Sequence, residues 1–497
     1  MNLATIIEGH ADERVAVISR GRPTTYGELR RQVGALRAGL IAIGVEPGDR
    51  VAVLAANNWF FVVFYLAALG AGAIVVPVNP ASPSRELERE LGVVGASVAV
   101  VGPSGRDAFA GIDRAAVRLE RVLVPEGVVL TDSEPLQQLF GHDPTPVIER
   151  SDDDDALLMF TAGTAGPSKA ARLTHGSLRA NIEQMQAHPG LHASSTDVAL
   201  DVLPLFHIYG LNVVLNQALM AGAAVVLAER FDPAGALDLI RDHGVTMVAG
   251  APPMFAAWAG MAGAAPAAFE GVRLAGSGGA PLTPEVAAGF ESRFGLPVWQ
   301  GYGLTEASPT VTSSLVGGEP KSGSIGVPLP GVDVRLVDVD GEDALAGDPG
   351  EIWVRGPNVF AGYWEDRDAT EAVITPDGWL RTGDIAVVDD DGYLFIVDRA
   401  KDLIIVSGFN VFPAEVEEVL LEHDNVAEAA VVGVEHPYSG ETVKAYVVPV
   451  PGTAVEEDEL IEFAAERLAR YKCPTTITFV DQLPQGLVGK VLRRALR

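Results

Sequence analysis

Short runs of β-branched residues alternate with longer apolar segments of helical periodicity, and this alternation constrains the fold most. Such runs occupy residues 50–54, 98–101, 224–227 and 246–249. Strands that are hydrophobic on both faces are typical of parallel sheets covered by helices on both sides. The sequence therefore predicts an α/β protein with a three-layer body.

Two stretches of the chain are similar to each other. Residues 60–78 and 209–227 each contain an apolar helical run, a break of alanine and glycine, and a short strand. This similarity predicts two related α/β subdomains within a large N-terminal body. From Gly331 onward, alternating segments separated by Asp-Gly and Pro-Gly turns indicate a further, β-rich subdomain.

The end of the chain has a different pattern. It predicts helices over residues 413–422 and 456–470 and strands over 427–434 and 442–449. Such a mixture is expected to form a small α+β domain. The polar segment 399–402 precedes it, and we place a boundary between domains there.

The composition excludes several classes of protein. A chain of 497 residues with 48% hydrophobic side chains can bury more than one core. Its 36 basic and 66 acidic residues give a net charge of −30, so nucleic acid is not an expected partner. Cys473 is the single cysteine and no secretory signal is recognised, which together favour a cytoplasmic location.

The uncharged stretch from Trp59 to Val78 is long enough to cross a bilayer. Its centre is broken by Gly70-Ala71-Gly72, and a short β-branched run that contains a proline follows. We therefore expect a buried helix and a strand here, and no transmembrane segment.

A loop rich in small residues follows the apolar strand expected at residues 156–160. It reads Thr161-Ala162-Gly163-Thr164-Ala165-Gly166-Pro167-Ser168-Lys169. Small residues let backbone NH groups approach phosphate oxygens, while two threonine hydroxyls and one lysine add donors and charge. The spacing is not that of a Walker A loop. Taken alone, the segment fits either a phosphate-binding loop or a flexible surface loop.

Further motifs follow in a fixed order, and with them the chain resembles the adenylate-forming enzymes. This family comprises acyl-CoA synthetases, coumarate ligases, luciferases and the adenylation domains of peptide synthetases, and the resemblance is closest to fatty-acid–CoA ligases. It extends from about Thr24 to Arg494. The motifs that carry it are the small-residue loop, Pro204–Gly210, Ser277–Leu282, Gly301–Glu306, Gly378–Asp384, Asp398–Ile404, Ser407-Gly408 and Gly489-Lys490.

The resemblance implies a domain organisation and a role for each motif residue. An AMP-binding domain over residues 1–398, a hinge at 399–402 centred on Lys401, and a mobile C-terminal lid domain over 403–497 are expected. Lys490, Thr305, Glu306 and His207 are grouped as catalytic, with Glu306 as the Mg²⁺ ligand and His207 lining the acid pocket rather than acting as a base. The residues implied for binding ATP or coenzyme A are Thr161, Ala162, Gly163, Thr164, Ala165, Lys169, Gly279, Ala280, Gln300, Gly301, Tyr302, Asp384, Arg399 and Gly408.

The chain departs from the family pattern at several positions. Ala162 stands where serine is usual and Ala165 where threonine is common, so the phosphate loop has fewer hydroxyls. The segment before Lys490 also lacks the usual hydroxyl residue. These departures leave open a second reading, in which the protein binds nucleotide or acyl-AMP without turnover.

The expected acid and its acceptor are inferred from single residues and from the charge of short segments. His207 stands where amino-acid-activating relatives have an aspartate, and the segments expected to line the acid pocket carry no charged residue. An apolar monocarboxylate is therefore expected, a medium or long fatty acid first and an aryl acid second. Few residues separate Glu306 from Asp384 in the sequence, which favours coenzyme A over a carrier protein as the acceptor, although a carrier protein stays an alternative. A homodimer also stays open.

Overall fold

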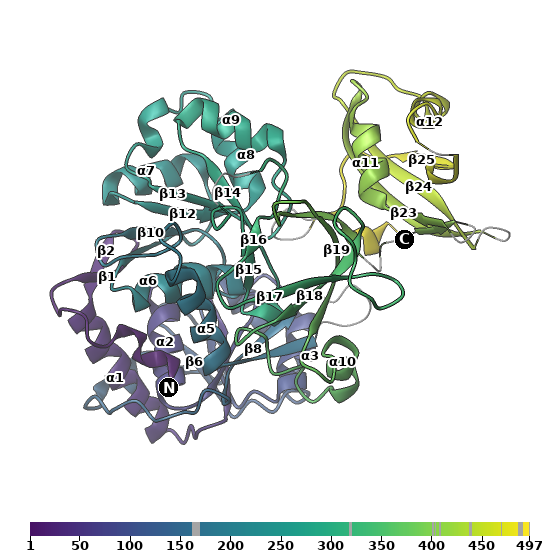
Figure 1. Cartoon of the computed structure of the whole chain (residues 1–497). Helices are drawn as coiled ribbons and strands as arrows, with labels where there is room; N and C mark the ends of the chain where they lie inside the picture. The colour runs from purple at the N-terminus through teal and green to yellow at the C-terminus, as the bar shows by residue number, and fades with distance from the viewer. Residues whose placement is uncertain are drawn as a thin grey trace. The chain divides into compact units, whose positions relative to one another are not determined.

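The computed structural model of the protein describes residues 1–161, 169–317, 321–399, 402, 404–406, 409–436, 440–468, 470–485 and 491–496. The chain divides into two compact units (Figure 1). The first unit contains Met1–Asp333 and Val354–Leu380, and the second contains Val334–Trp353 and Arg381–Arg497. The hinge expected at residues 399–402 stays a prediction, because Ala400 and Lys401 lie outside the described residues.

The first unit contains two large sheets. The strand order of one of them is β7-β6-β5-β3-β4-β8-β9, parallel except for the antiparallel pair β8 and β9. Its strands are β3 (Arg50–Leu54), β4 (Ile74–Pro77), β5 (Val98–Val101), β6 (Arg121–Val124), β7 (Glu134–Pro135), β8 (Asp155–Thr161) and β9 (Lys169–Thr174). Its helices are α2 (Trp59–Gly70), α3 (Ser84–Val94), α4 (Arg106–Ala110) and α5 (His175–Gln186).

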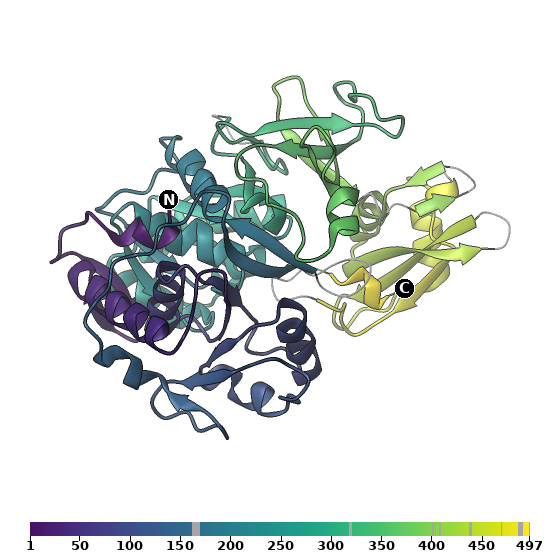
Figure 2. The same ribbon diagram turned by 90° about the horizontal axis from the view of Figure 1, so that it is seen from below.

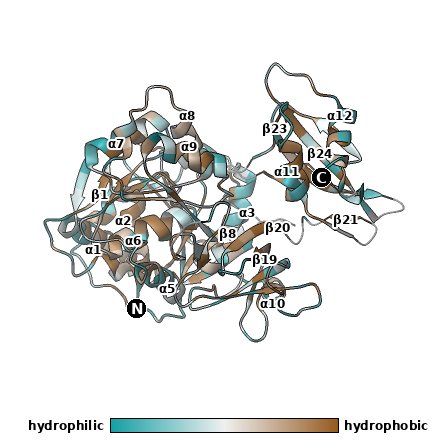
Figure 3. Ribbon diagram, turned by 45° about the horizontal axis from the view of Figure 1, so that its top comes forward, coloured by the Kyte–Doolittle hydropathy of each residue, from teal (hydrophilic) through white to brown (hydrophobic). Residues whose placement is uncertain are grey.

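The uncharged stretch forms a buried helix and a strand, as its glycines predict. All residues of α2 from Phe60 to Gly70 are buried, and β4 follows after a glycine turn. Hydrophobic residues are also concentrated in strands such as β8 (Figure 3). In the part of the chain that the structure describes, no helix is both long and apolar enough to span a bilayer.

The second sheet of this unit has the strand order β16-β15-β14-β13-β12-β10-β11-β1-β2. The strands from β14 to β1 run parallel. The strands are β1 (Val15–Ser19), β2 (Arg22–Thr25), β10 (Val198–Asp201), β11 (Ala224–Leu227), β12 (Met247–Gly250), β13 (Leu274–Ser277), β14 (Val298–Gly303), β15 (Thr310–Ser313) and β16 (Val327–Pro328). The helices are α1 (Tyr26–Ala42), α6 (Gln217–Met220), α7 (Pro233–His243), α8 (Pro252–Gly260) and α9 (Pro284–Phe294), and α10 (Arg367–Val373) comes later in the unit.

Local sequence explains where these helices begin. The hydroxyl of Thr25 accepts a hydrogen bond from the backbone of Glu28, and the Glu28 carboxylate accepts one from the backbone of Thr25. This capping box satisfies two backbone donors at the start of α1. From there α1 packs along α2, so the two sheets share a helical layer (Figures 1 and 2).

The second unit contains a β-rich sheet and a small α+β fold. The β-rich sheet has the order β17-β18-β19-β20, with β17 (Asp333–Val337), β18 (Gly350–Arg355), β19 (Leu380–Val388) and β20 (Leu394–Arg399). The C-terminal sheet has the order β22-β21-β24-β23, with β25 beside β24. Its elements are β21 (Ile404–Val406), β22 (Phe409–Val411), α11 (Pro413–Leu421), β23 (Val426–His436), β24 (Gly440–Pro449), α12 (Glu457–Ala465) and β25 (Thr476–Phe479). Val416, Leu420 and Leu460 pack in one core with this sheet.

The α/β fold class predicted from the sequence is confirmed, but the body is not the single three-layer sandwich expected, because it contains two large sheets that share a helical layer. There are also two local differences. The helix expected over 456–470 ends at Ala465, and a turn follows in which the backbone of Leu468 donates to Ala464 O over 2.8 Å. The apolar run after residue 208 is wound as a π-helix, η4 (Tyr209–Asn216), before α6 begins. Hydropathy alone does not distinguish these two windings.

Candidate active site

The described ends of the small-residue loop lie opposite each other at the end of a hairpin. Thr161 is the last residue of β8 and pairs in register with Lys169, the first residue of β9. The Thr161 hydroxyl donates to the Lys169 carbonyl over 3.4 Å. Residues 162–168, which include Ala162, Gly163, Thr164 and Ala165, lie outside the described residues.

Glu306 lies directly after β14, in the short 3₁₀ helix η6 (Thr305–Ala307), which also contains Thr305. The backbone carbonyl of Glu306 accepts a hydrogen bond from the NH of Phe360 over 2.9 Å. Its carboxylate oxygen Oε1 accepts a second one from the phenol of Tyr363 over 2.8 Å. Burial and the nearby negative charge of Glu306 raise the pKa of Tyr363, so the phenol keeps its proton at neutral pH and acts as a donor.

Tyr363 also contacts the lysine of the hairpin. The Lys169 ammonium lies 5.2 Å from the centre of the Tyr363 ring, a cation–π distance. The Lys169 and Glu306 side chains, 137 positions apart in the sequence, therefore share one aromatic neighbour. Tyr363 was not among the residues expected from the sequence, although the aromatic pair Tyr363-Trp364 in a polar segment is a signal for it.

The segments expected to enclose adenine lie on neighbouring parallel strands. Ser277 at the end of β13 pairs in register with Gln300 of β14. Gly279 follows β13 with a φ of +83°, a backbone conformation that favours glycine, and Ala280 comes next. Gly301 and Tyr302 continue β14 beyond Gln300. All of these residues lie at the carboxyl ends of the strands, where open α/β sheets bind their ligands.

His207 lies between β10 and the π-helix, and Tyr209 is the first residue of that helix. The His207 Nδ1 accepts a hydrogen bond from the backbone NH of Tyr209 over 3.2 Å, so the proton of the neutral ring is on Nε2. Burial lowers the pKa of His207 to about 4, and the ring is neutral at pH 7. The phenol of Tyr209 donates to Gly276 O over 3.4 Å, and a Cβ added at Gly278 would lie 3.1 Å from the Tyr209 ring. The Tyr209 ring therefore packs directly against β13.

Further site residues expected from the sequence belong to the second unit. Asp384 is buried in β19, its backbone NH donates to the Thr382 hydroxyl over 3.1 Å, and it pairs in register with Arg399 of β20. Lys401, Gly408 and Lys490 lie outside the described residues.

The described side chains fit a metal that arrives with its substrate. Among these residues, no group of three or more His, Cys, Asp or Glu could hold a metal by itself. Mg²⁺ often binds through one or two carboxylates and takes its other ligands from phosphates and water. A single carboxylate, Glu306, near one ammonium, Lys169, suits a magnesium–nucleotide complex better than a resident metal ion.

Comparisons with known proteins show the family to which the chain belongs. Residues 4–364 match the AMP-binding enzyme family, and residues 415–490 match the AMP-binding enzyme C-terminal domain. A feruloyl-CoA synthase of Amycolatopsis sp is 40% identical, over 97% of this chain and 95% of the relative. A long-chain-fatty-acid–CoA ligase of Yersinia pestis is 37% identical, over 98% of this chain and 91% of the relative.

A solved structure has the same fold as this chain. The ATP-bound MatB of Rhodopseudomonas palustris superposes with a TM-score of 0.92 at 32% identity, over 100% of this chain and 98% of that one. The matched family covers most of the sequence, and the curated relatives are similar over nearly their whole length. The chain therefore belongs to the AMP-binding enzyme family and is an AMP-forming acid–thiol ligase.

Proposed function

We propose that the protein activates an apolar monocarboxylic acid with ATP and transfers the acyl group to coenzyme A. The observation that carries this proposal is the placement of Lys169 and Glu306 around Tyr363, beside a loop of small residues. An ammonium at the end of a hairpin, with a carboxylate nearby, can receive a triphosphate together with its Mg²⁺.

The nucleotide would be held by residues from several segments. Thr161, Thr164 and Lys169, with backbone NH groups of Ala162, Gly163 and Ala165, would bind the β- and γ-phosphates. Thr305 would contact the α-phosphate, and Glu306 would ligate Mg²⁺, which neutralises phosphate charge when bound. Adenine would lie against Gly279, Ala280, Gln300, Gly301 and Tyr302, and the ribose hydroxyls would bind Asp384 and Arg399.

Two half-reactions follow from this arrangement. In the first, a carboxylate oxygen of the acid attacks the α-phosphorus, the bond to the β-phosphate oxygen breaks, and pyrophosphate leaves. Lys490 would stabilise the charge that develops there. In the second, the thiol of coenzyme A loses its proton, its sulfur attacks the acyl carbon, and AMP leaves.

The two half-reactions need different groups at the acyl carbon. A rotation about Lys401 would withdraw Lys490 and bring in the segment that contains Gly408, where a missing side chain leaves room for the pantetheine arm. The hinge and the lid motion stay predictions, as do a cytoplasmic location and a homodimer.

The sequence ranks a medium or long fatty acid first and an aryl acid second; from the placement of Tyr209 we propose the reverse order, with an aryl acid first and a medium or long fatty acid second. Absence of charge in the expected acid pocket is compatible with both. The placement of Tyr209 favours the aryl acid, because its ring fills space beside Gly276 and Gly278 that a long alkyl chain would need. Neutral His207 adds no charge that would repel or bind a second polar group. The names of the relatives include both acid classes, a feruloyl-CoA synthase and a long-chain-fatty-acid–CoA ligase, so the proposed order rests on Tyr209.

A comparison of acids tests this choice. We expect a higher kcat/KM for ferulate than for palmitate with the natural chain. Tyr209→Ala should reverse that order, because it removes the ring and lengthens the space beside β13. A Tyr209→Phe variant is the matched control, since it keeps the ring and loses only the hydroxyl. A natural chain that prefers palmitate, with no response to Tyr209→Ala, would contradict the aryl assignment.

A further inference from the structure

We propose that Tyr363 is a positioning residue for the binding of magnesium–ATP, a role that rests on the proposed function. In this role its hydroxyl holds the Glu306 carboxylate in the orientation that receives the cation. Its ring forms a cation–π contact with the Lys169 ammonium before the nucleotide binds. Tyr363 would therefore act through two neighbours without contacting the reacting atoms.

The geometry of the three side chains carries this proposal. The Tyr363 hydroxyl is 2.8 Å from Glu306 Oε1, and Lys169 Nζ is 5.2 Å from the ring centre. A hydrogen bond to an ionised carboxylate is stronger than one between neutral groups, so it restricts the rotation of that carboxylate. The same ring is attracted to an ammonium through its π-face.

The backbone around Tyr363 is fixed on both sides, which a positioning role requires. Tyr363 forms an isolated bridge with Ala171 of β9, and the NH of Trp364 donates to Ala170 O over 2.8 Å. The NH of Tyr363 donates to the Thr370 hydroxyl over 2.9 Å. The ring of Phe360 packs edge-on against the Tyr363 ring with centres 5.0 Å apart. A short segment thus links the hairpin of Lys169 to the backbone of Glu306.

A consequence is that the Glu306 carboxylate and the Lys169 ammonium are already positioned before the nucleotide binds. A carboxylate that could rotate would lose part of its binding free energy when the cation fixes it. An ammonium and a carboxylate in one region also attract each other, and a fixed partner for each opposes their collapse onto one another. Removing the hydroxyl should therefore weaken binding of the cation more than binding of the nucleotide.

The test measures binding in the full chain, with Mn²⁺ as the probe in place of Mg²⁺. Electron paramagnetic resonance reports bound Mn²⁺, so its affinity for the enzyme–ATP complex is read without turnover. We expect Tyr363→Phe to weaken this affinity about tenfold, the size expected for a hydrogen bond to a charged group. ATP binding in excess chelator, measured by calorimetry, should change less than about twofold, because the ring under Lys169 remains.

Two further variants separate the parts of this role. Tyr363→Leu removes both hydroxyl and ring, and we expect it to weaken chelated ATP binding as well. Tyr26→Phe is the matched control: its hydroxyl donates to Leu219 O and Ala223 O at a buried position of α1, so its loss affects stability and not Mn²⁺ affinity. In a Glu306→Gln background, Tyr363→Phe should have no further effect on Mn²⁺ affinity.

Natural Mn²⁺ affinity in both folded Tyr363 variants would overturn the inference while leaving the proposed function intact. Equal weakening by Tyr363→Phe in the natural chain and in the Glu306→Gln background would also overturn it, because the effect would then not pass through the carboxylate. If the natural chain binds Mn²⁺–ATP yet forms no acyl-CoA from any acid, the proposed function fails and the role of Tyr363 in metal binding stands.

Discussion

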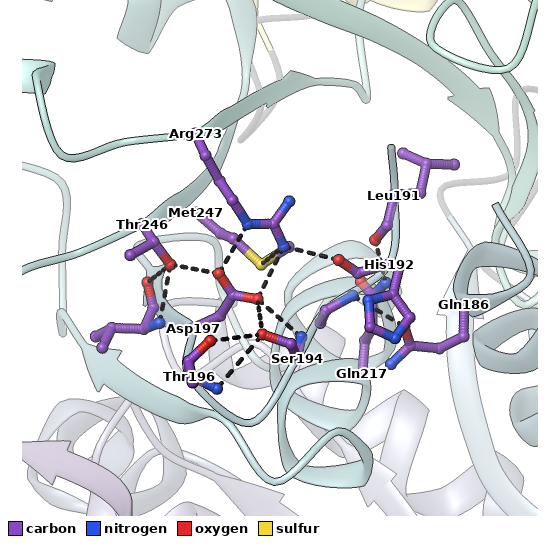
Figure 4. A network of polar contacts seen from close by, with 12 residues as sticks. Gln186, Leu191, His192, Ser194, Thr196, Asp197, Gln217, Thr246, Met247 and Arg273 are labelled. Carbon is purple, nitrogen blue, oxygen red and sulfur yellow. Dashed lines mark hydrogen bonds and ion pairs between the residues drawn. The ribbon is translucent and has the colours of Figure 1, made fainter. Parts of the chain in front are cut away.

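The guanidinium of Arg273 holds the carboxylate of Asp197 through two hydrogen bonds of 2.8 Å, from Nε to Oδ1 and from Nη2 to Oδ2 (Figure 4). Asp197 also accepts hydrogen bonds from the backbone of Ser194 and from the hydroxyl of Thr246. Asp197, Thr246 and Arg273 immediately precede β10, β12 and β13. The network therefore fastens the amino ends of three neighbouring strands, whose carboxyl ends lead into the candidate site.

Arg273→Ala is expected to lower the free energy of unfolding by about 3 kcal/mol, because it leaves Asp197 as a buried carboxylate without its cation. Chemical denaturation followed by circular dichroism measures this change. Arg241→Ala is the control, since Arg241 pairs with Asp238 and Asp242 at the surface and its loss should have no measurable effect. Equal stability of the two variants would contradict a structural role for the network.

Asp201→Asn is expected to become more stable relative to the natural chain as the pH rises above about 4. Asp201 is fully buried at the end of β10, and the backbone NH of Leu203, a polar group that favours its charged form, offsets only part of that burial. Burial raises its pKa well above the usual value, so over the intervening pH range the folded state keeps a proton that the unfolded state releases. Stability from this group is present at low pH and lost as the pH rises toward the folded pKa.

Denaturation curves of both proteins between about pH 4 and 8 measure this difference. The diagnostic quantity is how the difference in free energy of unfolding between the two proteins changes with pH. Replacing the side chain by an amide also shifts that difference by a constant amount, which does not depend on pH. A difference that is independent of pH would show that Asp201 is ionised in the folded protein.

In the natural chain, the free energy of unfolding is expected to fall as the pH drops below neutral, partly because of His175. His175→Gln is expected to make this pH dependence shallower. His175 is buried, and its Nδ1 accepts a hydrogen bond from the backbone NH of Leu3 over 3.0 Å. Burial lowers its pKa from 6.5 to about 4, so the unfolded chain binds the extra proton between these values. The contribution of His175 is present above pH 6.5 and is lost as the pH falls toward 4. Unfolding measured across this range should show a shallower pH dependence in the variant, and an unchanged slope would contradict the assignment.

Lys401→Pro is expected to retain pyrophosphate release and to lose thioester formation by orders of magnitude. Proline fixes φ at about −65° and also restricts the residue before it, which would prevent the rotation proposed for the hinge. Both half-reactions are measured separately, the second from supplied acyl-AMP and coenzyme A. A normal rate of acyl-CoA formation from acyl-AMP would exclude a hinge at this residue.

Much of the fold could be predicted because buried parallel strands are continuous apolar runs. The runs at 50–54, 98–101 and 224–227 coincide with β3, β5 and β11. The π-helical winding after residue 208 could not be predicted, since a segment of 8 residues is too short for its apolar spacing to distinguish a π-helix from an α-helix. It depends on tertiary contacts such as those of the buried Asn212 amide, which donates to Leu178 O and Ser308 O.

Candidate site residues could be proposed from the sequence where a motif is contiguous, and they were missed where the site is formed by tertiary contacts. Thr305 and Glu306, or Thr161 and Lys169, are recognised from short segments. The hydrogen bond from Tyr363 joins residues 57 positions apart, and no local periodicity reports such a contact. The pairing of the segment around Tyr363 with β9 was missed for the same reason, because it follows from the folded path of the chain.

The stoichiometry of products with ATP, Mg²⁺, coenzyme A and ferulate tests the proposed reaction most directly. We expect equal amounts of AMP, pyrophosphate and feruloyl-CoA, with pyrophosphate released only when the acid is present. Lys490→Ala should form no acyl-CoA from ATP and acid, yet should still convert supplied feruloyl-AMP to feruloyl-CoA. ATP binding without acid-dependent pyrophosphate release, for ferulate and for a panel of aryl and fatty acids, would contradict the assignment of the protein as an acyl-CoA ligase.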